Sequence, residues 1–410
     1  MTHEPLSAAG APWPDLEARM REMSARDVKW RDGRTGMYVF NAGEDVERVK
    51  KAAYAMFSEE NGLGPMAFPS LARMEREVVA HALALLHAPE DAGGAMTSGG
   101  TDSIVMAVKT ARDYARAHGL KGQGNLVTPF TAHPAFHKAA MMMDLEIRRV
   151  PTKDLLADAA AMEAVCDANT IMIVGSAPCF PFGLIDPIEA LSEVALRKNL
   201  WLHVDACVGG FLAPFVEMNG AKLPAWDFRV PGVRSISSDL HKYGYCSKGA
   251  STLLFRGKAT KDHMVFDAGP WPMGRMLTPT LAGTRPGGAI AAAWAVLNYL
   301  GVEGYRAKQA LVVEARESIE SGVARLGFRV LGKPQLGIVA FTHDTADCFT
   351  ILRGMYKRGW MTASNVDPPS LHLMLSPKHA EVAGEYLRDL EASMNDGASD
   401  TPMPAPGYAR

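Results

Sequence analysis

The sequence predicts an α/β protein with a large domain built on a mostly parallel sheet and a smaller α+β domain at the C-terminal end. Between about residues 125 and 205, short apolar runs with strand character alternate with helical patterns, as in βαβ units. A long amphipathic pattern over 306–326 follows, and shorter strands and helices alternate beyond it. The length of 410 residues fits one large plus one smaller domain better than a single small core.

The amino-acid composition argues against several classes of binding partner. The chain is 48% hydrophobic and 21% charged, which is ordinary for a globular protein, and a net charge of -2 gives no basic surface for nucleic acid or an anionic membrane. Five separated cysteines form no C-x-x-C pair, so we expect no metal site, no disulfide framework and a reducing compartment. The sequence contains neither a leader pattern nor an apolar run of membrane-spanning length, which predicts a cytoplasmic protein with no integral membrane segment.

The chain divides into four predicted regions, which are an N-terminal arm (1–60), a large domain (61–305), a small C-terminal domain (306–394) and a loose tail (395–410). Ser70 is the expected cap of an amphipathic helix over 71–86. Strands are expected over 125–128, 146–150, 170–175, 200–205, 328–331, 337–342 and 371–375. Helices are expected over 16–30, 44–56, 104–117, 135–143, 155–167, 188–198, 289–300, 306–326, 348–358 and 378–394.

A glycine turn precedes the helix over 104–117, and it contains Ser98, Gly99 and Gly100. Small residues at a helix start leave several backbone N–H groups unpaired at the positive end of the helix dipole, where they can bind a phosphate. A capped helix with an ordinary glycine turn would have the same pattern. The segment alone leaves both interpretations open.

Three further residues follow strands of the predicted parallel sheet, whose carboxyl ends are where such sheets bind ligands. Lys242 lies in the polar run 235–244, between a Pro-Gly turn and an apolar strand-like segment. Asp205 ends the strand 200–205 before small residues, and His133 opens the helix at 135. Taken singly, each has an ordinary interpretation, as a solvated lysine, a strand-terminal cap or a surface histidine.

In combination, these parts are what pyridoxal phosphate requires of its protein. The cofactor needs a lysine for a Schiff base, a carboxylate at the pyridine nitrogen, an anion cradle and a flat group against its ring. We therefore predict that Lys242 carries the Schiff base, that Asp205 meets the pyridine nitrogen and that His133 stacks on the ring. Partial burial beside other cations is expected to lower the pKa of Lys242.

Several motifs together resemble the fold-type I pyridoxal phosphate enzymes of the decarboxylase-like group, and within them the sphingosine-1-phosphate lyases. They lie over 97–103, 180–187, 202–211, 235–245 and 278–288, and the resemblance runs from about residue 55 to 390. It implies a homodimer with shared active sites and a lysine in the active site at Lys248. It also implies that the cofactor phosphate is bound by Ser98, Gly99, Gly100, Ser238 and His241, and by Thr284 of the neighbouring subunit.

The resemblance implies a lyase that cleaves the C2–C3 bond of a phosphorylated long-chain base to a fatty aldehyde and phosphoethanolamine. Lys248 and the substrate phosphate are both candidates for the general base, and Lys248 and Arg285 for partners of that phosphate. Gly64 and Phe182 depart from the family at positions expected near the substrate, where the lyases carry a histidine at the first position and at least some of them carry one at the second. An amino-acid decarboxylase and a catalytically impaired relative remain as alternatives.

Overall fold

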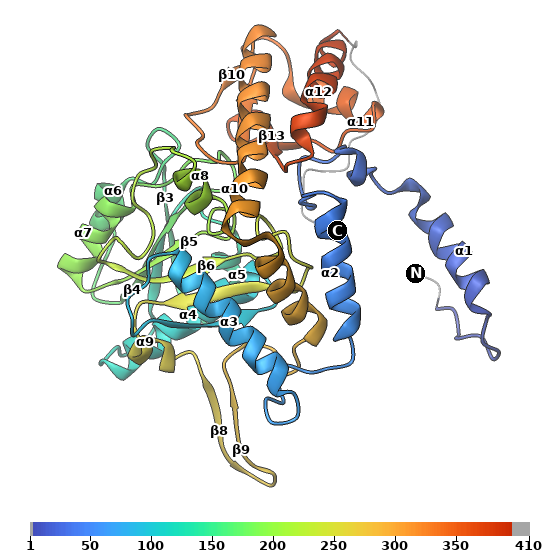
Figure 1. The fold of residues 1–410 in the computed structure, drawn as a ribbon. Coiled ribbons are helices and arrows are strands. Elements are labelled where there is room, and N and C mark those ends of the chain that lie inside the picture. Colours follow the sequence, from blue (N-terminus) through green and yellow to red (C-terminus); the bar gives the residue numbers. More distant parts are fainter. Residues whose placement is uncertain (1–2, 396–410) are drawn as a thin grey trace.

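The structure is a computed structural model that describes residues 3–395, and every structural statement below concerns those residues. It confirms the predicted α/β class (Figure 1). A seven-stranded sheet with the order β1-β7-β6-β5-β4-β2-β3 forms the centre of the large domain, and a four-stranded sheet with the order β10-β11-β13-β12 lies in the C-terminal part. The tail predicted over 395–410 lies, after residue 395, outside the described residues.

The large sheet is parallel except for one strand. β7 runs antiparallel to both β1 and β6, and all other neighbours in the sheet are parallel. Its strands are β1 (Gly93–Thr97), β2 (Asn125–Pro129), β3 (Glu146–Val150), β4 (Thr170–Ser176), β5 (Trp201–Asp205), β6 (Val233–Ser238) and β7 (Ser251–Phe255). The small sheet contains β10 (Arg329–Val330), β11 (Ile338–Thr342), β12 (Ala363–Val366) and β13 (Pro369–Met374).

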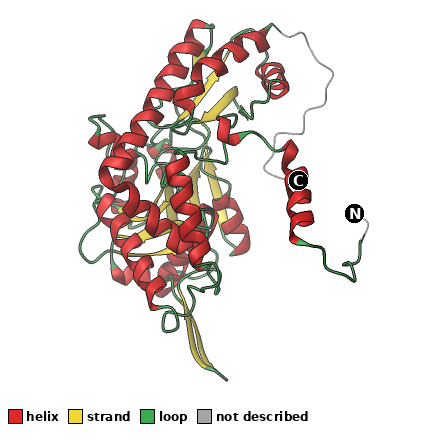
Figure 2. Ribbon diagram, turned by 45° about the vertical axis from the view of Figure 1, so that its right-hand side comes forward, coloured by secondary structure: helices red, strands yellow, loops and turns green. Residues whose placement is uncertain are grey.

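Helices cover the large sheet, and the small sheet packs against α10, α11 and α12 (Figures 1 and 2). The α-helices are α1 (Trp13–Met23), α2 (Glu44–Met56), α3 (Pro69–Leu85), α4 (Gly100–Ala117), α5 (Ala135–Met142), α6 (Ala159–Ala164), α7 (Ile188–Lys198), α8 (Ala213–Met218), α9 (Lys258–Asp262), α10 (Gly287–Arg325), α11 (Cys348–Lys357) and α12 (His379–Met394). No residue of α1 is buried, and this helix extends away from the body in both views.

The central strands bury both faces, because their side chains alternate between two apolar cores. In β2, Leu126 packs with the core under α4 and α5, whereas Val127 packs with the core under α3, α7 and α10. Met172 and Ile173 of β4 divide in the same way. Continuous apolar strands of this kind are typical of a parallel sheet covered by helices on both faces, which is the arrangement the sequence predicted.

Several local predictions were wrong. Helix α3 begins at Pro69, after Phe68 at the N-cap, so Ser70 is inside the first turn and does not cap it. The helix expected over 155–167 is only α6, because Asp158 accepts hydrogen bonds from the N–H groups of Ala160 and Ala161 and starts the helix there. Strands β1 and β12 and the projecting hairpin of β8 (Phe266–Trp271) and β9 (Gly274–Thr278) were missed.

The two helices expected over 289–300 and 306–326 are consecutive segments of α10. Gly301 separates them with a φ of 54°, a left-handed conformation that glycine adopts without steric cost. The domain boundary expected between residues 305 and 306 falls just after this break, and it stays a prediction. Among the described helices, none combines the length and apolar character needed to cross a bilayer.

Candidate active site

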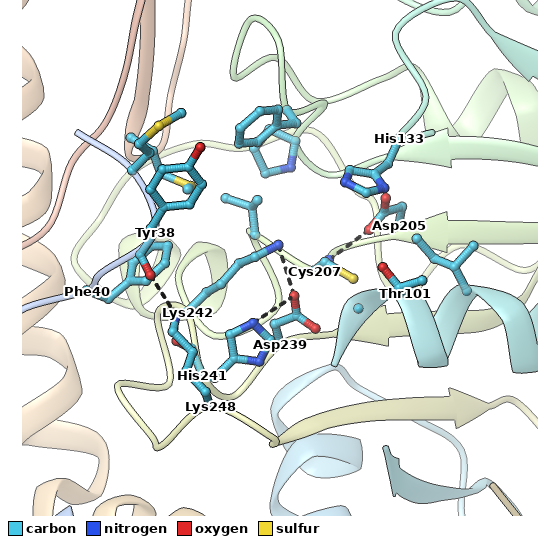
Figure 3. Close-up of a pocket in the computed structure, with 17 residues that line it drawn as sticks. Tyr38, Phe40, Thr101, His133, Asp205, Cys207, Asp239, His241, Lys242 and Lys248 are labelled. Carbon is cyan, nitrogen blue, oxygen red and sulfur yellow. Dashed lines mark hydrogen bonds and ion pairs between the residues drawn. The ribbon is translucent and has the colours of Figure 1, made fainter. Parts of the chain in front are cut away.

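A cavity of about 350 Å³ opens at the carboxyl ends of the parallel strands. Polar side chains gather on its walls from loops far apart in the sequence, and they include His133, Asp205, Asp239, Lys242 and Lys248 (Figure 3). The remaining wall is largely apolar, with side chains from the N-terminal segment, from α4, from the loops after β4 and β5, and from β13. These are Met37, Phe40, Ile104, Pro178, Phe180, Val208 and Met374.

Lys242 follows β6 in a tight turn that places its amine inside the cavity (Figure 3). Its side chain is 21% exposed, and its Nζ atom lies 2.9 Å from Oδ2 of Asp239. The expectation that the pKa of Lys242 is lowered was wrong. Burial does favour the neutral amine, but the charge of Asp239, supported by Cys207 and Asp205, outweighs it and raises the pKa.

Asp205 reaches the cavity from the end of β5, and hydrogen bonds to its carboxylate fix the position of the side chain. Its Oδ1 atom accepts the backbone N–H of Cys207 at 3.1 Å and the hydroxyl of Ser237 at 3.4 Å. The Ser237 hydroxyl lies in turn 3.2 Å from Nε2 of the buried His203, so the carboxylate has a fixed direction. The position suits a group that meets a ring nitrogen in the cavity.

His133 lies close to Asp205 on the same wall (Figure 3). Its Nδ1 atom accepts the backbone N–H of Ala135 at 3.1 Å, which fixes the ring at the start of α5. Burial lowers the pKa of His133, although Asp205 opposes this effect, so the imidazole is neutral. A neutral, flat ring facing the cavity can stack on an aromatic ligand.

Lys248 enters the cavity from the opposite wall (Figure 3). Its amine donates a hydrogen bond of 2.7 Å to the backbone carbonyl of Tyr38. Burial and the charge of Lys242 lower the pKa of Lys248 to about 8, with a smaller contribution from Lys50. The two lysines of one cavity thus have pKa values moved in opposite directions, which is typical of an acid and base pair.

The predicted phosphate cradle is only partly assembled around this cavity. Gly100 and His241 line it, and a Cβ atom built on Gly99 would approach His241 at 3.7 Å. Ser98 does not line it, because its backbone N–H and its hydroxyl both donate to Asp102. Ser238 is fully buried against Gly210, and its hydroxyl has no hydrogen-bond partner in the described part of the chain.

Thr284 lies outside this cavity, in an exposed segment where its hydroxyl accepts a 3.3 Å hydrogen bond from the amide of Asn61. Gly64 belongs to the same region, since its N–H donates to the carbonyl of Asn61. Arg285 also does not line the cavity, and it forms an ion pair with Glu75. Phe182 is buried in a separate apolar cluster with Leu184 and Leu331, so its side chain is not part of the cavity wall.

Sequence reasoning missed the residues that close the cavity. The segment 37–40 was assigned to an N-terminal arm, yet Met37, Tyr38 and Phe40 form one wall. The apolar run Met37 to Phe40 between polar stretches was an available signal. Tyr38 has a φ of 66°, so the backbone of this wall is held in a conformation that is uncommon for a tyrosine. Asp239, which lies in the polar run 235–244, was given no role from the sequence.

The residues present fit pyridoxal phosphate. An amine, a supported carboxylate and a neutral imidazole share one cavity beside the N-terminus of α4, where unpaired N–H groups favour an anion. A Cβ atom at Gly100 would come within 2.9 Å of Asp239 and Cys207, so only glycine leaves this turn open. The buried Oδ1 atom of Asp239 and the Ser238 hydroxyl have no partner among the described residues.

Comparisons with known proteins agree with this geometry. A family model described as the pyridoxal-dependent decarboxylase conserved domain matches residues 28–344. The chain is 41% identical over 403 residues to a sphingosine-1-phosphate lyase of Oryza sativa subsp. japonica, covering 96% of this chain and 74% of the rice protein. The structure of a sphingosine-1-phosphate lyase from Burkholderia pseudomallei superimposes with a TM-score of 0.92 at 38% identity, covering 96% of this chain and 92% of that one. A Lactobacillus brevis glutamate decarboxylase, at 20% identity and a TM-score of 0.84, shares the fold.

Fold and site together define a pyridoxal phosphate-dependent enzyme of the decarboxylase-like group. The predicted cofactor is thereby confirmed. Within this group, the chain belongs to the sphingosine-1-phosphate lyase family.

Proposed function

We propose that the protein is a pyridoxal phosphate-dependent lyase that cleaves the C2–C3 bond of a phosphorylated long-chain base of the sphingosine 1-phosphate type, releasing a fatty aldehyde and phosphoethanolamine. The observation that carries this proposal is the high identity to a lyase of that name over nearly the whole chain. The proposal is also supported by a single cavity that is lined by Lys242, Asp205, His133 and Lys248.

We assign the cofactor contacts residue by residue. Lys242 would supply the amine that links to the cofactor, Asp205 would meet its ring nitrogen, and the ring of His133 would stack on it. The turn at Gly99 and Gly100 would offer backbone N–H donors for its phosphate, and His241 lines the cavity close to this turn. When bound, pyridoxal phosphate supplies an electron-accepting ring to which the substrate amine can be joined.

Lys248 is the proposed general base. Its lowered pKa leaves part of the amine neutral near pH 7, and its Nζ atom can accept the proton of the substrate C3 hydroxyl. The Tyr38 carbonyl, 2.7 Å away, holds the amine in place. The raised pKa of Lys242 keeps its free amine protonated.

The apolar wall suits the hydrocarbon part of such a substrate. Phe40, Phe180 and Met374 come from three separate parts of the chain and form a surface that water does not solvate well. The charged side chains of Asp239, Lys242 and Lys248 line the same cavity, so its lining divides into apolar and charged groups. An amphiphile with a phosphorylated amino head and an apolar tail matches this division.

We further propose that the enzyme works as a homodimer in a reducing, cytoplasmic setting. Thr284 and Gly64 lie together and outside the cavity of their own chain, which supports a role at the partner's site. Five free cysteines support the reducing compartment.

The direct test is to supply the purified holoenzyme with a phosphorylated long-chain base and to measure fatty aldehyde and phosphoethanolamine together. Equal amounts of both products are expected. The decarboxylase name of the family model makes amino-acid decarboxylation the second candidate. Carbon dioxide from an amino acid, with no aldehyde from the phosphorylated base, would establish that alternative.

A further inference from the structure

The cavity contains a second buried carboxylate, that of Asp239, to which the proposed cofactor contacts give no role. Asp239 is 2% exposed and follows directly after β6. Its Oδ2 atom lies 2.9 Å from Nζ of Lys242 and 3.7 Å from Nε2 of His241. Its Oδ1 atom is buried and has no partner within hydrogen-bond geometry among residues 3–395, although the Ser251 hydroxyl contributes to lowering the pKa of Asp239. Asp205 already supplies the carboxylate for the ring nitrogen, so Asp239 has a different role.

The position of Asp239 is closely constrained. The Oδ2 atom of Asp239 would lie only 2.9 Å from a Cβ atom built on Gly100. The backbone N–H of Asp239 donates to the carbonyl of Cys207 at 3.3 Å. The carboxylate therefore lies between Gly100 and the amine at the end of the Lys242 side chain (Figure 3 shows the contact with the amine). It has little room to turn away from the amine.

The environment keeps this carboxylate charged. Burial alone would raise the pKa of Asp239, but the charge of Lys242, with smaller contributions from His241 and from hydrogen bonds with Ser251 and Lys242, outweighs burial and lowers it. The groups that raise the pKa of Lys242 are Asp239, Asp205 and Cys207. The charge of Lys242 in turn lowers the pKa values of His133 and Lys248. Of these groups, Asp239 is the one recorded within hydrogen-bonding distance of the amine.

A lysine that links to a cofactor has to leave it when the substrate amine takes its place, and it has to return afterwards. We propose that Asp239 is a positioning residue for Lys242, which receives the released amine as an ammonium, holds it below the glycine turn and directs its return. Asp239 forms no covalent bond and transfers no proton in this role. The proposal rests on the cofactor assignment and not on the identity of the substrate.

The test is an absorbance titration of the enzyme-bound cofactor against pH, in the full-length holoenzyme without substrate. Asp239→Asn keeps the shape of the side chain and removes its charge. The Lys242 nitrogen then loses the negative charge that lies 2.9 Å from its free amine in the structure, and the titration midpoint is expected to fall by about one pH unit or more. A purely structural role would lower the thermal stability and leave this midpoint in place.

Asp102→Asn is the matched control. Asp102 is also a buried aspartate beside the glycine turn with one unpartnered oxygen, but its bonded oxygen accepts from Ser98 and not from Lys242. The midpoint of the absorbance titration of Asp102→Asn should stay at the wild-type value. A midpoint that is the same in wild type and Asp239→Asn, or that moves equally in both variants, would overturn the proposal.

A second measurement needs no variant. Competitive labelling of the cofactor-free wild-type protein with acetic anhydride over a pH series reports the titration of each lysine amine. Lys242 is expected to titrate at higher pH than the exposed Lys121 in the same digest. Titration of Lys242 at or below the pH of Lys121 would refute the pairing, whatever substrate the enzyme proves to use.

Discussion

Replacement of Lys248 by methionine or arginine tests the chemistry that the cavity can perform. The structure lowers the pKa of Lys248 to about 8 through burial and the neighbouring charge of Lys242. A lysine at the ordinary value of about 10.4 has roughly one neutral amine in 2,500 at pH 7, whereas a lysine with this lowered pKa has about one in ten. The environment therefore increases the population of the competent base about two-hundredfold.

The expected pH dependence follows from the sign of this change. A base acts in its neutral form, so the turnover rate should rise about tenfold between about pH 7 and pH 9 and then level off. Lys248→Met should reduce turnover about 10²- to 10⁴-fold, the usual contribution of a positioned base. Lys248→Arg should not restore it, because a guanidinium remains protonated throughout this range.

The assay is aldehyde release from a phosphorylated long-chain base, followed across pH for wild type and variants. The absorbance of the bound cofactor is recorded in parallel, and it should persist in the Lys248 variants because we assign the link to Lys242. Lys50→Met is a graded control, since Lys50 contributes to lowering the pKa of Lys248. It should move the profile slightly to higher pH and keep the plateau rate. A Lys248→Arg enzyme within threefold of wild type would refute this assignment.

Three other predictions concern the cofactor site and its attachment to the small domain. Lys242→Ala should abolish both the visible absorbance of linked cofactor and turnover, with an unchanged far-ultraviolet circular dichroism spectrum; normal turnover would disprove the assignment of Lys242. Asp205→Ala should reduce turnover far more than cofactor retention, as measured by dialysis and absorbance, and wild-type activity would rule out its role at the ring nitrogen. The Tyr243 hydroxyl donates to the carbonyls of Leu375 at 2.7 Å and Gly337 at 3.2 Å, so Tyr243→Phe should destabilise the protein by about 1–3 kcal/mol in denaturant unfolding. An unchanged unfolding midpoint would show that these bonds do not hold the lysine turn to the small domain.

The main sheet and the cofactor residues were predictable because they depend on local patterns. Asp205 ends a continuous apolar strand, and such strands are typical of a sheet covered on both faces. Since ligands bind at the carboxyl ends of parallel strands, His133, Asp205 and Lys242 could be placed together before any coordinates were known. Their roles at the cofactor stay predictions.

The closing wall of the cavity was not predictable in the same way. Met37 and Phe40 contact a cavity whose other walls are separated from them by scores of residues, and no local periodicity indicates that contact. The pKa of Lys242 was misjudged for a related reason. The sequence shows His241 beside the lysine, but only the fold shows that the turn after β6 brings Asp239 to 2.9 Å from its amine.

The most direct measurement is a product analysis of the purified holoenzyme with sphingosine 1-phosphate beside a panel of amino acids. The account predicts a fatty aldehyde and phosphoethanolamine in equal amounts from the phosphorylated base, and no carbon dioxide from the amino acids. Carbon dioxide from an amino acid, without aldehyde from the base, would contradict it.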